Sequence, residues 1–249
     1  AKPDLGCRGA GVRRLHDHAD LADYIADFPA GETIIFQQYI AHEGEAGIFY
    51  IRRPNAKTGR IPSITLKYFP WVEGDGRRTL RELIMDDERA GEVPHLYLDR
   101  HQDRLDEIIP AGEAVRLAFA GSHSRGAIFR DGSHLVTDAM RATFDEISHA
   151  LGGFHFGRFD IRFADFEDVR NGRGFTILEV NGAGAEATHI WDARARLGDA
   201  YRSLREQYRL LFEIGAANRR AGVRPPSLRS MWRAMRREAD LTTAYPPTE

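Results

Sequence analysis

The chain has 249 residues, of which 42% are hydrophobic, 10% aromatic and 29% charged, a composition typical of globular proteins rather than fibrous or disordered ones. Its 35 basic and 37 acidic residues give a net charge of −2, so overall charge does not indicate a nucleic-acid or membrane partner. The single cysteine, Cys7, excludes an internal disulfide and a multi-cysteine zinc site, which favours a reducing, cytoplasmic location, and no apolar run reaches the ~20 residues that span a bilayer.

The first part of the chain predicts a glycine-rich loop, a helix and an antiparallel sheet. Gly6, Gly9 and Gly11 predict a loop whose backbone turns tightly and can approach a ligand closely. Apolar residues at helical spacing predict a helix over 15–28. Runs of β-branched and aromatic residues predict three strands, over 33–40, 47–52 and 61–69, with a turn at 54–59.

The middle of the chain predicts two helices and four further strands. Thr79 and Glu82 form the pattern of a capping box and predict a short helix over 79–84. A second helix is predicted over 138–151, where Gly152 and Gly153 end it. The predicted strands cover 114–119, 126–129, 156–163 and 175–181, with a polar turn at 165–174.

Helical patterns follow from about residue 194 to Gly222 and again over 227–237, and this segment is basic. Residues 194–249 contain 12 arginines and 6 acidic residues. The basic helices are compatible with a solvated helix face, and also with binding to an anionic membrane surface, an acidic polymer or a protein partner.

Two predicted strands carry a polar face. Strand periodicity puts Arg158, Asp160 and Arg162 on one side of residues 156–163, and Glu179 and Asn181 on one side of residues 175–181. If the two strands pair, Asp160, Glu179 and Asn181 form an oxygen cluster of the kind that Mg²⁺ prefers. The alternative is an exposed sheet face with cross-strand pairs between arginines and carboxylates.

The order of the motifs resembles a known superfamily. Lys2-Pro3 precedes the glycine-rich loop, and a hinge at 36–40, Gly74-Asp75-Gly76, Arg158-x-Asp160 and Glu179-x-Asn181 follow. In this order they resemble the ATP-grasp superfamily, specifically its carboxylate-amine ligases, which include D-alanine-D-alanine ligase and cyanophycin synthetase. The resemblance covers residues 1–192. It implies an α+β fold in which two α+β subdomains with antiparallel sheets grip the nucleotide, followed by a C-terminal helical extension over 193–249.

The resemblance also implies that a preceding domain is missing, since such enzymes have about a hundred residues before the lysine that corresponds to Lys2. We therefore expect the natural protein to be longer at its N-terminus. We expect acceptor specificity to reside largely in that region and in the loops at 86–110 and 121–126.

Residue by residue, the resemblance implies a nucleotide site. Lys2 would contact the inner phosphates, and Gly6, Gly9 and Gly11 would form a lid over the outer phosphates. The adenine would lie at the hinge, where the family usually has a glutamate at the position of Gln37. The ribose hydroxyls would contact Glu45 or, if the alignment is shifted, Glu43. The implied adenine contacts are Gln37, Tyr39 and Ile40.

The same resemblance implies catalytic and metal-binding residues. Arg158 would contact the β- or γ-phosphate, and Lys67 would lie near the transferred phosphate, although Lys67 also fits a solvated strand lysine. One or two Mg²⁺ ions, for which Mn²⁺ can substitute, would be held by Asp160, Glu179 and Asn181. Asp75 fits a turn residue, and Cys7 has no evident base that would make it a nucleophile.

The implied activity is an ATP- and Mg²⁺-dependent ligation of a carboxylate to an amine through an acyl phosphate, with release of ADP and phosphate. Its substrates would be small-molecule or peptide carboxylates and amines, and no nucleic acid would bind. The enzyme would form a homodimer. His123, Arg125 and His189 fit either the acceptor site or polar loops. Two alternatives remain open: a phosphotransferase acting on a small molecule, and a degenerate nucleotide-binding module without catalysis.

Overall fold

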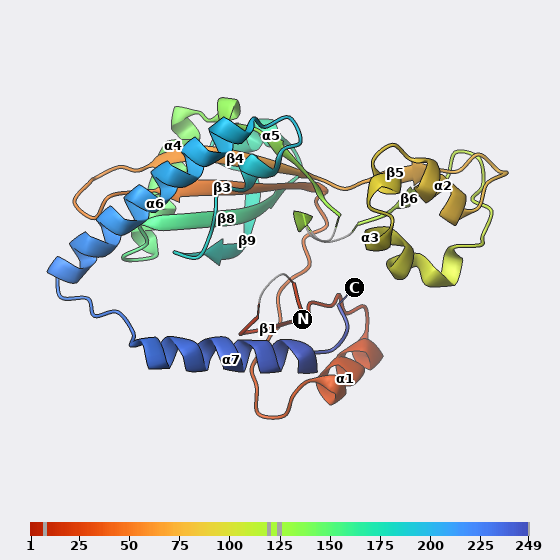
Figure 1. The fold of residues 1–249 in the computed structure, drawn as a ribbon, viewed down its shortest axis with the longest axis horizontal. Helices are drawn as coiled ribbons and strands as arrows, with labels where there is room; N and C mark the ends of the chain where they lie inside the picture. The colour runs from red at the N-terminus through yellow and green to blue at the C-terminus, as the bar shows by residue number, and fades with distance from the viewer. Residues whose placement is uncertain (7–8, 119–120, 124–125, 249) are drawn as a thin grey trace. The chain divides into compact units, whose positions relative to one another are not determined.

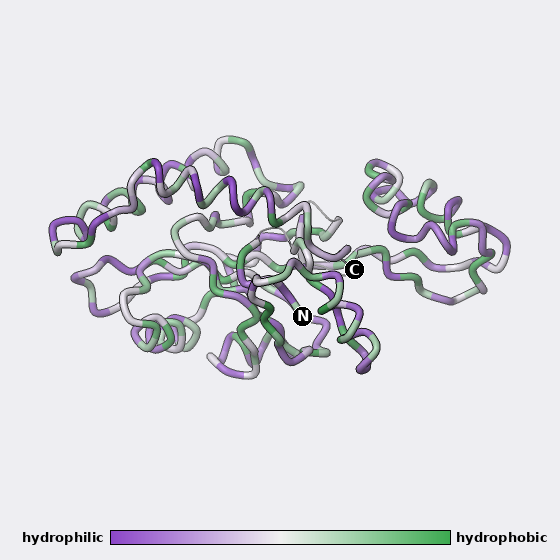
Figure 2. Tube along the Cα trace, turned by 90° about the horizontal axis from the view of Figure 1, so that it is seen from below, coloured by the Kyte–Doolittle hydropathy of each residue, from purple (hydrophilic) through white to green (hydrophobic). Residues whose placement is uncertain are grey.

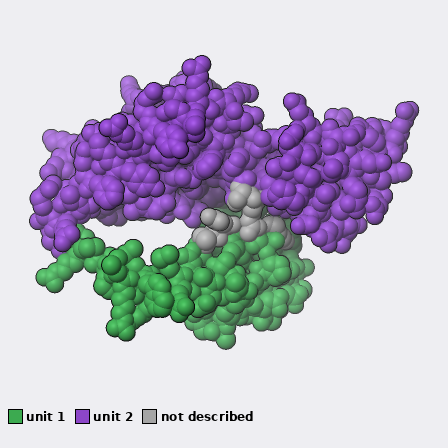
Figure 3. All heavy atoms as spheres, in the orientation of Figure 1, with its two compact units in different colours: residues 1–41, 223–249 green, residues 42–222 purple. Residues whose placement is uncertain are grey.

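The chain forms two compact units. The computed structural model describes residues 1–6, 9–118, 121–123 and 126–248. One unit comprises residues 1–41 and 223–249, and the other comprises residues 42–222 (Figure 3). The smaller unit therefore combines both ends of the sequence. The domain boundary at 192/193 that the resemblance implies stays a prediction.

The larger unit is built on a five-stranded antiparallel sheet (Figure 1). In spatial order its strands are β7 (Ile128–Asp131), β4 (Arg60–Tyr68), β3 (Gly44–Ile51), β8 (Phe156–Phe163) and β9 (Phe175–Asn181). The predicted strands at 156–163 and 175–181 are confirmed at the same bounds, because their alternation of polar and apolar residues matches a half-buried strand.

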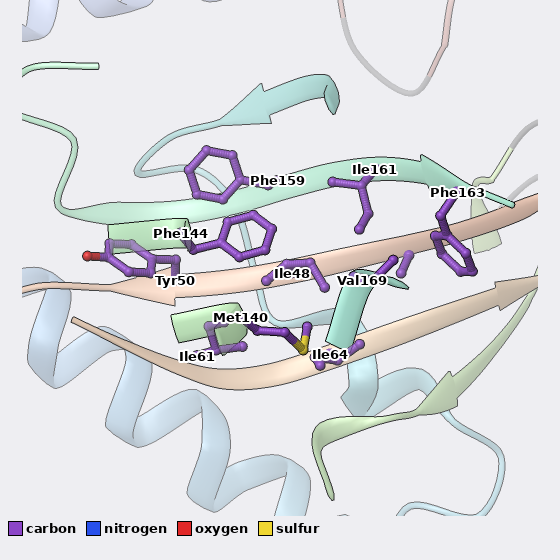
Figure 4. Packing of buried hydrophobic residues seen from close by; sticks show 11 residues of the cluster. Ile48, Tyr50, Ile61, Ile64, Met140, Phe144, Phe159, Ile161, Phe163 and Val169 are labelled. Atoms are coloured by element: carbon purple, nitrogen blue, oxygen red, sulfur yellow. The ribbon is translucent and has the colours of Figure 1, made fainter. Parts of the chain in front are cut away.

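One face of this sheet is packed against two helices. Helix α4 (Asp138–Ala150) contributes Met140 and Phe144, and helix α5 (Phe166–Arg170) contributes Val169. The ring of Phe144 lies 5.2 Å from that of Phe159 on β8. Figure 4 shows these side chains between the sheet and the helices, together with others of the cluster: Ile48, Tyr50, Ile61, Ile64, Ile161 and Phe163.

The opposite face of the sheet is divided between an apolar and a polar part. Helix α6 (Leu197–Arg220) packs Leu210 and Ile214 onto Phe49, Ile51 and Phe156, which lie at one end of strands β3 and β8. Toward the other end the same face carries charged side chains. A strand therefore supplies the core on one side and the candidate site on the other.

A second, smaller core belongs to the same unit. Strands β5 (Trp71–Glu73) and β6 (Ala114–Arg116) pair antiparallel beside helices α2 (Leu80–Asp86) and α3 (His95–Leu98) and the short 3₁₀ helices at Ala90–Glu92 and Asp99–Arg104. Their buried side chains include Val72, Leu80, Ile84, Tyr97 and Val115. The capping box predicted at Thr79 and Glu82 is confirmed.

The smaller unit joins the first and last segments of the chain. Strand β1 (Lys2–Pro3) pairs with β2 (Ile34–Ile35), and the unit also holds helices α1 (His18–Asp27) and α7 (Leu228–Ala244). Aromatic rings connect the two termini: Tyr24 stacks on Phe28 at 5.6 Å, and Phe28 stacks on Tyr245 at 5.3 Å.

The α+β class with antiparallel sheets and C-terminal helices is thus confirmed, while some elements differ. Only Ile34–Ile35 of the strand predicted over 33–40 forms a strand, because only these two residues find a pairing partner, in Lys2–Pro3. The predicted turn at 165–174 contains α5, and the segment 227–237 belongs to the longer helix α7. Two further 3₁₀ helices in the described part of the chain lie at Ser133–Leu135 and Thr188–Trp191.

Hydrophobic positions are interleaved with hydrophilic ones along the chain (Figure 2). Among the residues that the structure describes, no helix is both long enough and apolar enough to cross a membrane.

Tyr50 provides a test of the main core. Its side chain is fully buried, its hydroxyl donates to Oδ1 of Asp145 at 2.5 Å, and burial together with Asp145 raises the pKa of Tyr50 to about 12. A raised folded-state pKa contributes stability that is complete below the ordinary value near 10 and is lost as pH rises toward 12. We expect Tyr50→Phe to cost about 1–2 kcal/mol at pH 7 and to remove this alkaline loss, which approaches 1.4 kcal/mol per pH unit.

Urea unfolding of both proteins between neutral and alkaline pH measures this effect. Tyr208→Phe, at an exposed position on α6, serves as the control. Equal alkaline slopes in the wild type and in Tyr50→Phe would contradict the assignment.

Candidate functional site

The polar face of the five-stranded sheet brings together residues that are distant in sequence. The register places Glu45 of β3 opposite Lys67 of β4, and it places Asp160 of β8 opposite Glu179 of β9. On the same pair of strands, Arg158 lies opposite Asn181. Residues 158–162 and 179–181 were predicted to place their polar side chains on one face of the sheet. Together with Glu45 and Lys67 they form a cluster across the neighbouring strands β4, β3, β8 and β9.

Lys67 is the centre of a buried ion cluster. Its Nζ lies 2.9 Å from Oε1 of Glu45 and 3.0 Å from Oδ1 of Asp160, and all three side chains are 6–7% exposed. Arg158 binds both oxygens of Asp160, with Nε 3.0 Å from Oδ1 and Nη2 3.0 Å from Oδ2. Nδ2 of Asn181 donates to Oδ2 of Asp160 at 2.9 Å. The alternative of a solvated strand lysine is therefore excluded for Lys67.

Two glycines make room for the charged side chains. A Cβ atom on Gly47 would lie 2.9 Å from Cδ of Arg158 and 3.2 Å from Oδ1 of Asp160. A Cβ atom on Gly121 would lie 1.8 Å from Oε1 of Glu45. A side chain at Gly121 would displace the carboxylate of Glu45, and one at Gly47 would make Arg158 shift and press on Asp160.

Lys67 and Asp160 hold each other ionised. Burial is the largest effect on Asp160 and raises its pKa, but Lys67 and Arg158 outweigh it and lower the pKa of this carboxyl. For Lys67, burial lowers the pKa, whereas Asp160 and Glu45 outweigh it and raise the pKa of this amine. Because their opposite charges compensate one another, Lys67 and Asp160 stay charged at neutral pH although both are almost inaccessible to water.

Glu45 is held by two cations, Lys67 and Arg162, whose Nε lies 3.4 Å from Oε2 of Glu45. A contact between Glu45 and a ribose would therefore compete with these partners. Glu43, the other residue predicted for the ribose, is 72% exposed and pairs with Arg116 at 2.8 Å. The strand pattern places Arg162 on the polar face, among arginines suited to phosphate oxygens, but it does not predict the pairing with Glu45, which depends on the register between β3 and β8.

The predicted metal ligands are adjacent but do not form a ready-made metal centre. Asp160 contacts Asn181, and Glu179 is its cross-strand neighbour on an exposed part of β9. In the described part of the chain, no three His, Cys, Asp or Glu side chains are grouped so as to hold a metal ion. The predicted set has only two such residues, since its third member is an amide, and both oxygens of Asp160 are in contact with Lys67 or Arg158.

The other predicted nucleotide contacts belong to the smaller unit. Lys2 lies on β1, while Gln37, Tyr39 and Ile40 follow β2 in irregular backbone. The guanidinium of Arg14 stacks on the ring of Tyr39 at 4.0 Å. The candidate residues thus fall into two sets, one in each compact unit.

The C-terminal tail holds the described part of the glycine-rich loop. Gly9 and Gly11 have φ values of 71° and 68°, which favour glycine over other residues. The Thr248 hydroxyl accepts from the amide of Gly11 at 3.0 Å and donates to the carbonyl of Gly9 at 2.9 Å. Tyr245 donates to the carbonyl of Leu5 at 2.5 Å. These contacts join residues more than 230 positions apart, and no sequence pattern predicts them.

We expect Thr248→Val to loosen this loop, because valine keeps the shape of threonine and removes both hydrogen bonds. The loss of about 1–1.5 kcal/mol corresponds to roughly tenfold faster hydrogen exchange at the amide of Gly11. Exchange measured by NMR checks this. Thr243→Val, which loses only a bond to a helix carbonyl in α7, should leave Gly11 unchanged, and equal exchange in both variants would contradict the role of Thr248.

Of the remaining candidates that the structure describes, Asp75 and His123 have structural partners. Asp75 accepts bonds from the amides of Arg77 and Arg78, as expected for a turn residue. The ring of His123 lies 5.2 Å from that of Phe129 and its Nδ1 contacts the carbonyl of Ala127. Nδ1 of His189 is buried without a hydrogen-bond partner, and burial lowers the pKa of this imidazole. Cys7 and Arg125 lie outside the described residues.

Comparison with known proteins gives a distant structural similarity. No protein-family model matches the chain, and no curated protein matches it. Among solved structures, the chain is similar to a bifunctional glutathione synthetase from Pasteurella multocida, with 17% sequence identity and a TM-score of 0.43. The similarity covers 70% of this chain and 25% of that protein, so the chain spans about a quarter of the length of that enzyme. A similarity this distant assigns neither family nor function.

Proposed function

We propose that this chain is part of an ATP-grasp ligase, which joins a carboxylate to an amine at the expense of ATP. The observation that carries the proposal is the buried cluster of Lys67, Arg158, Asp160 and Asn181. It brings together, on one face of an antiparallel sheet, residues that strand periodicity and the family resemblance predict as a phosphate and metal site. Burying a lysine and an arginine against one carboxylate costs more free energy than filling the same space with apolar side chains. A purely structural role therefore does not explain this cluster.

The proposed reaction has two steps. An oxygen of the carboxylate substrate attacks the γ-phosphorus of ATP, the bond to the bridging oxygen breaks, and ADP leaves. The amine nitrogen then attacks the carbonyl carbon of the acyl phosphate, the phosphate leaves, and the nitrogen loses a proton to solvent. The first step brings the anionic carboxylate toward the anionic phosphates, and the second step expels phosphate. Fixed positive charge at the site favours both steps because it offsets this negative charge.

The cations of the cluster supply that charge. Lys67 and Arg158 would contact the transferred phosphoryl group, and Arg162 adds a third positive charge beside Glu45. Because these side chains are already oriented by Glu45 and Asp160, little reorganisation is needed as charge develops in the transition state. Arg158 also donates to the carbonyl of Glu186 at 3.2 Å, which restricts its guanidinium further.

Asp160, Glu179 and Asn181 would hold one or two Mg²⁺ ions, with Mn²⁺ as a substitute. Two carboxylates and an amide oxygen are suitable ligands for such hard cations. Bound there, the metal would act as a Lewis acid that neutralises phosphate oxygens. Both oxygens of Asp160 contact Lys67 or Arg158, so a metal held there would share this carboxylate with those cations.

In the smaller unit, Lys2 and the amides of the glycine-rich loop would bind phosphates, and Gln37, Tyr39 and Ile40 would bind adenine. A backbone that presents amides in this way can cradle oxyanions. Gly6, Gly9 and Gly11 would form the described part of that loop. The substrates would be small-molecule or peptide carboxylates and amines, and assembly as a homodimer and a cytoplasmic location belong to the same proposal.

Trapping with hydroxylamine tests the proposed reaction. The full natural protein is incubated with ATP, Mg²⁺ and pools of carboxylates, with hydroxylamine as a general amine. Formation of a hydroxamate together with an equal amount of ADP is expected for an acyl phosphate. A phosphorylated product that is stable to hydroxylamine would instead indicate a phosphotransferase, and the absence of ADP with every pool would indicate a binding module.

A further inference from the structure

Positive charge is concentrated in one short segment of the chain. Residues 214–237 contain seven arginines, no lysine and no acidic residue, in a protein whose net charge is −2. Most of this segment lies in and before helix α7, whose N-cap is Ser227. Four of these arginines, Arg229, Arg233, Arg236 and Arg237, lie in α7, whereas Arg219 and Arg220 end α6 and Arg224 lies between the two helices.

The first turns of α7 also expose a stripe of large apolar side chains. Leu228, Met231, Trp232 and Met235 follow the spacing i, i+3, i+4, i+7, which aligns them on one side of a helix. Their exposed fractions are 85%, 46%, 55% and 65%, and no residue of α7 is buried. We name this stripe, together with the flanking arginines Arg229, Arg233 and Arg236, the α7 surface.

The arginines flank the stripe rather than interrupt it. Arg229 and Arg233 are offset from the stripe around the helix by the 3.6-residue period. The guanidinium of Arg236 lies 4.4 Å from the centre of the Trp232 ring, so one cation and the aromatic side chain share a border of the surface. The result is an amphipathic helix with an apolar side and a basic side.

The far end of α7 anchors this surface to its unit. Arg237 binds both carboxylate oxygens of Glu32, at 2.8 and 3.1 Å, and Tyr245 stacks on Phe28 at 5.3 Å. These contacts begin at the tenth residue of the helix and hold its C-terminal half, while the nine residues before Arg237 are all exposed. A fixed helix with an exposed apolar side can dock without having to fold first.

We propose that the α7 surface binds the surface of a membrane that contains anionic lipids. Arginines attract the lipid phosphates, and Leu228, Met231, Trp232 and Met235 enter the boundary between headgroups and acyl chains. Tryptophan is favoured at this depth because its ring is apolar and its N–H is polar. A soluble polyanion would engage the arginines but would leave the four apolar side chains in water, so charge and apolar pattern together favour the lipid surface.

Sedimentation with vesicles tests this proposal in the full natural protein. Vesicles of phosphatidylcholine are compared with vesicles in which about one third of the lipid is phosphatidylglycerol, at about 0.15 M salt. We expect binding to the anionic vesicles only. Removing three charges, in Arg229→Gln/Arg233→Gln/Arg236→Gln, should weaken the partition coefficient by about 100-fold, since each arginine contributes about fivefold.

Two further variants separate the two components of the surface. Trp232→Gln/Met235→Gln keeps every charge and should also weaken vesicle binding, by at least tenfold, through lost apolar burial. Arg81→Gln/Arg141→Gln/Arg173→Gln removes three exposed arginines of the larger unit and should bind as the wild type does. All of these side chains are exposed, so unchanged circular dichroism is expected throughout.

Three results would overturn the proposal. The first is no binding to anionic vesicles at any salt concentration. The second is binding that the triple variant of α7 and the triple variant of the larger unit weaken equally. The third is tight binding to heparin or polyphosphate that Trp232→Gln/Met235→Gln leaves unchanged while vesicles are not bound, which would identify a soluble polyanion as the partner.

Discussion

Replacing Lys67 by methionine is expected to lower the free energy of unfolding by about 3–5 kcal/mol at neutral pH, because it leaves buried carboxylates without their shared cation. Methionine matches the length and shape of the lysine stem, so little packing is lost. Asp160 keeps Arg158, and Glu45 keeps Arg162, but each loses a contact of 3.0 Å or less. Urea unfolding of the two proteins measures the difference.

The pH dependence distinguishes this effect from simple loss of packing. The folded-state pKa of Asp160 is lowered, so its contribution is present above the ordinary value of about 3.9 and is lost as pH falls through the folded-state value. The folded-state pKa of Lys67 is raised, so its contribution to the free energy of unfolding is present below about pH 10.4 and is lost as pH rises through the folded-state pKa. The deficit of Lys67→Met should therefore be largest between these limits and shrink in acid.

Lys57→Met is the matched control, since Lys57 is exposed in the turn between β3 and β4. It should change the free energy of unfolding by less than about 0.5 kcal/mol. A deficit of Lys67→Met as small as that of the control, or one that is the same at every pH, would show that the ion cluster does not have the assigned role.

Replacing Asp160 by asparagine is expected to reduce ADP formation by about 10²–10³-fold, the effect typical of removing one preorganised electrostatic group. Asparagine has nearly the same volume and can still contact Asn181, but it cannot balance Lys67 and Arg158. The loss should fall mainly on kcat, because the cations that contact the transferring phosphoryl group are no longer oriented. The assay is ADP release with the carboxylate and hydroxylamine described above.

Asp168→Asn provides the comparison, since Asp168 pairs with Arg173 on the surface of the same unit. Its ADP formation should match that of the wild type. If Asp160→Asn retained full activity while folding normally, the cluster would be structural, and the proposed catalytic role of Arg158 and Lys67 would be wrong.

The strands of the sheet could be predicted because the alternation of polar and apolar residues is a property of each strand by itself. The alternation in residues 156–163 and 175–181 follows from one buried and one polar face, and it holds wherever the strand finds its partners. The five residues of α5 are too few to produce a helical period, so the turn at 165–174 concealed them. The apolar run at 33–40 resembled a strand, but pairing is a property of two segments, and only Ile34–Ile35 has a partner.

The candidate site was predictable only in part, for the same reason. Asp160 and Asn181 were expected on one face, but the contact of Lys67 with Asp160 depends on the position of β3 between their strands. Gly47 lies opposite Asp160 and leaves space for its carboxylate, which no motif indicates. The hydrogen bonds of Thr248 with Gly9 and Gly11 likewise form because the last residues of the chain belong to the same unit as the first ones.

The most direct test of the proposed function is calorimetric titration of a non-hydrolysable ATP analogue into the full natural protein, first with Mg²⁺ and then with EDTA. Glu179→Gln is titrated in parallel, because it removes one proposed metal ligand on an exposed part of β9 and leaves the buried ion cluster intact. We predict binding that requires Mg²⁺ and is at least tenfold weaker in Glu179→Gln. No binding by the wild type, or binding that neither EDTA nor the substitution weakens, would contradict a nucleotide and metal site on this sheet.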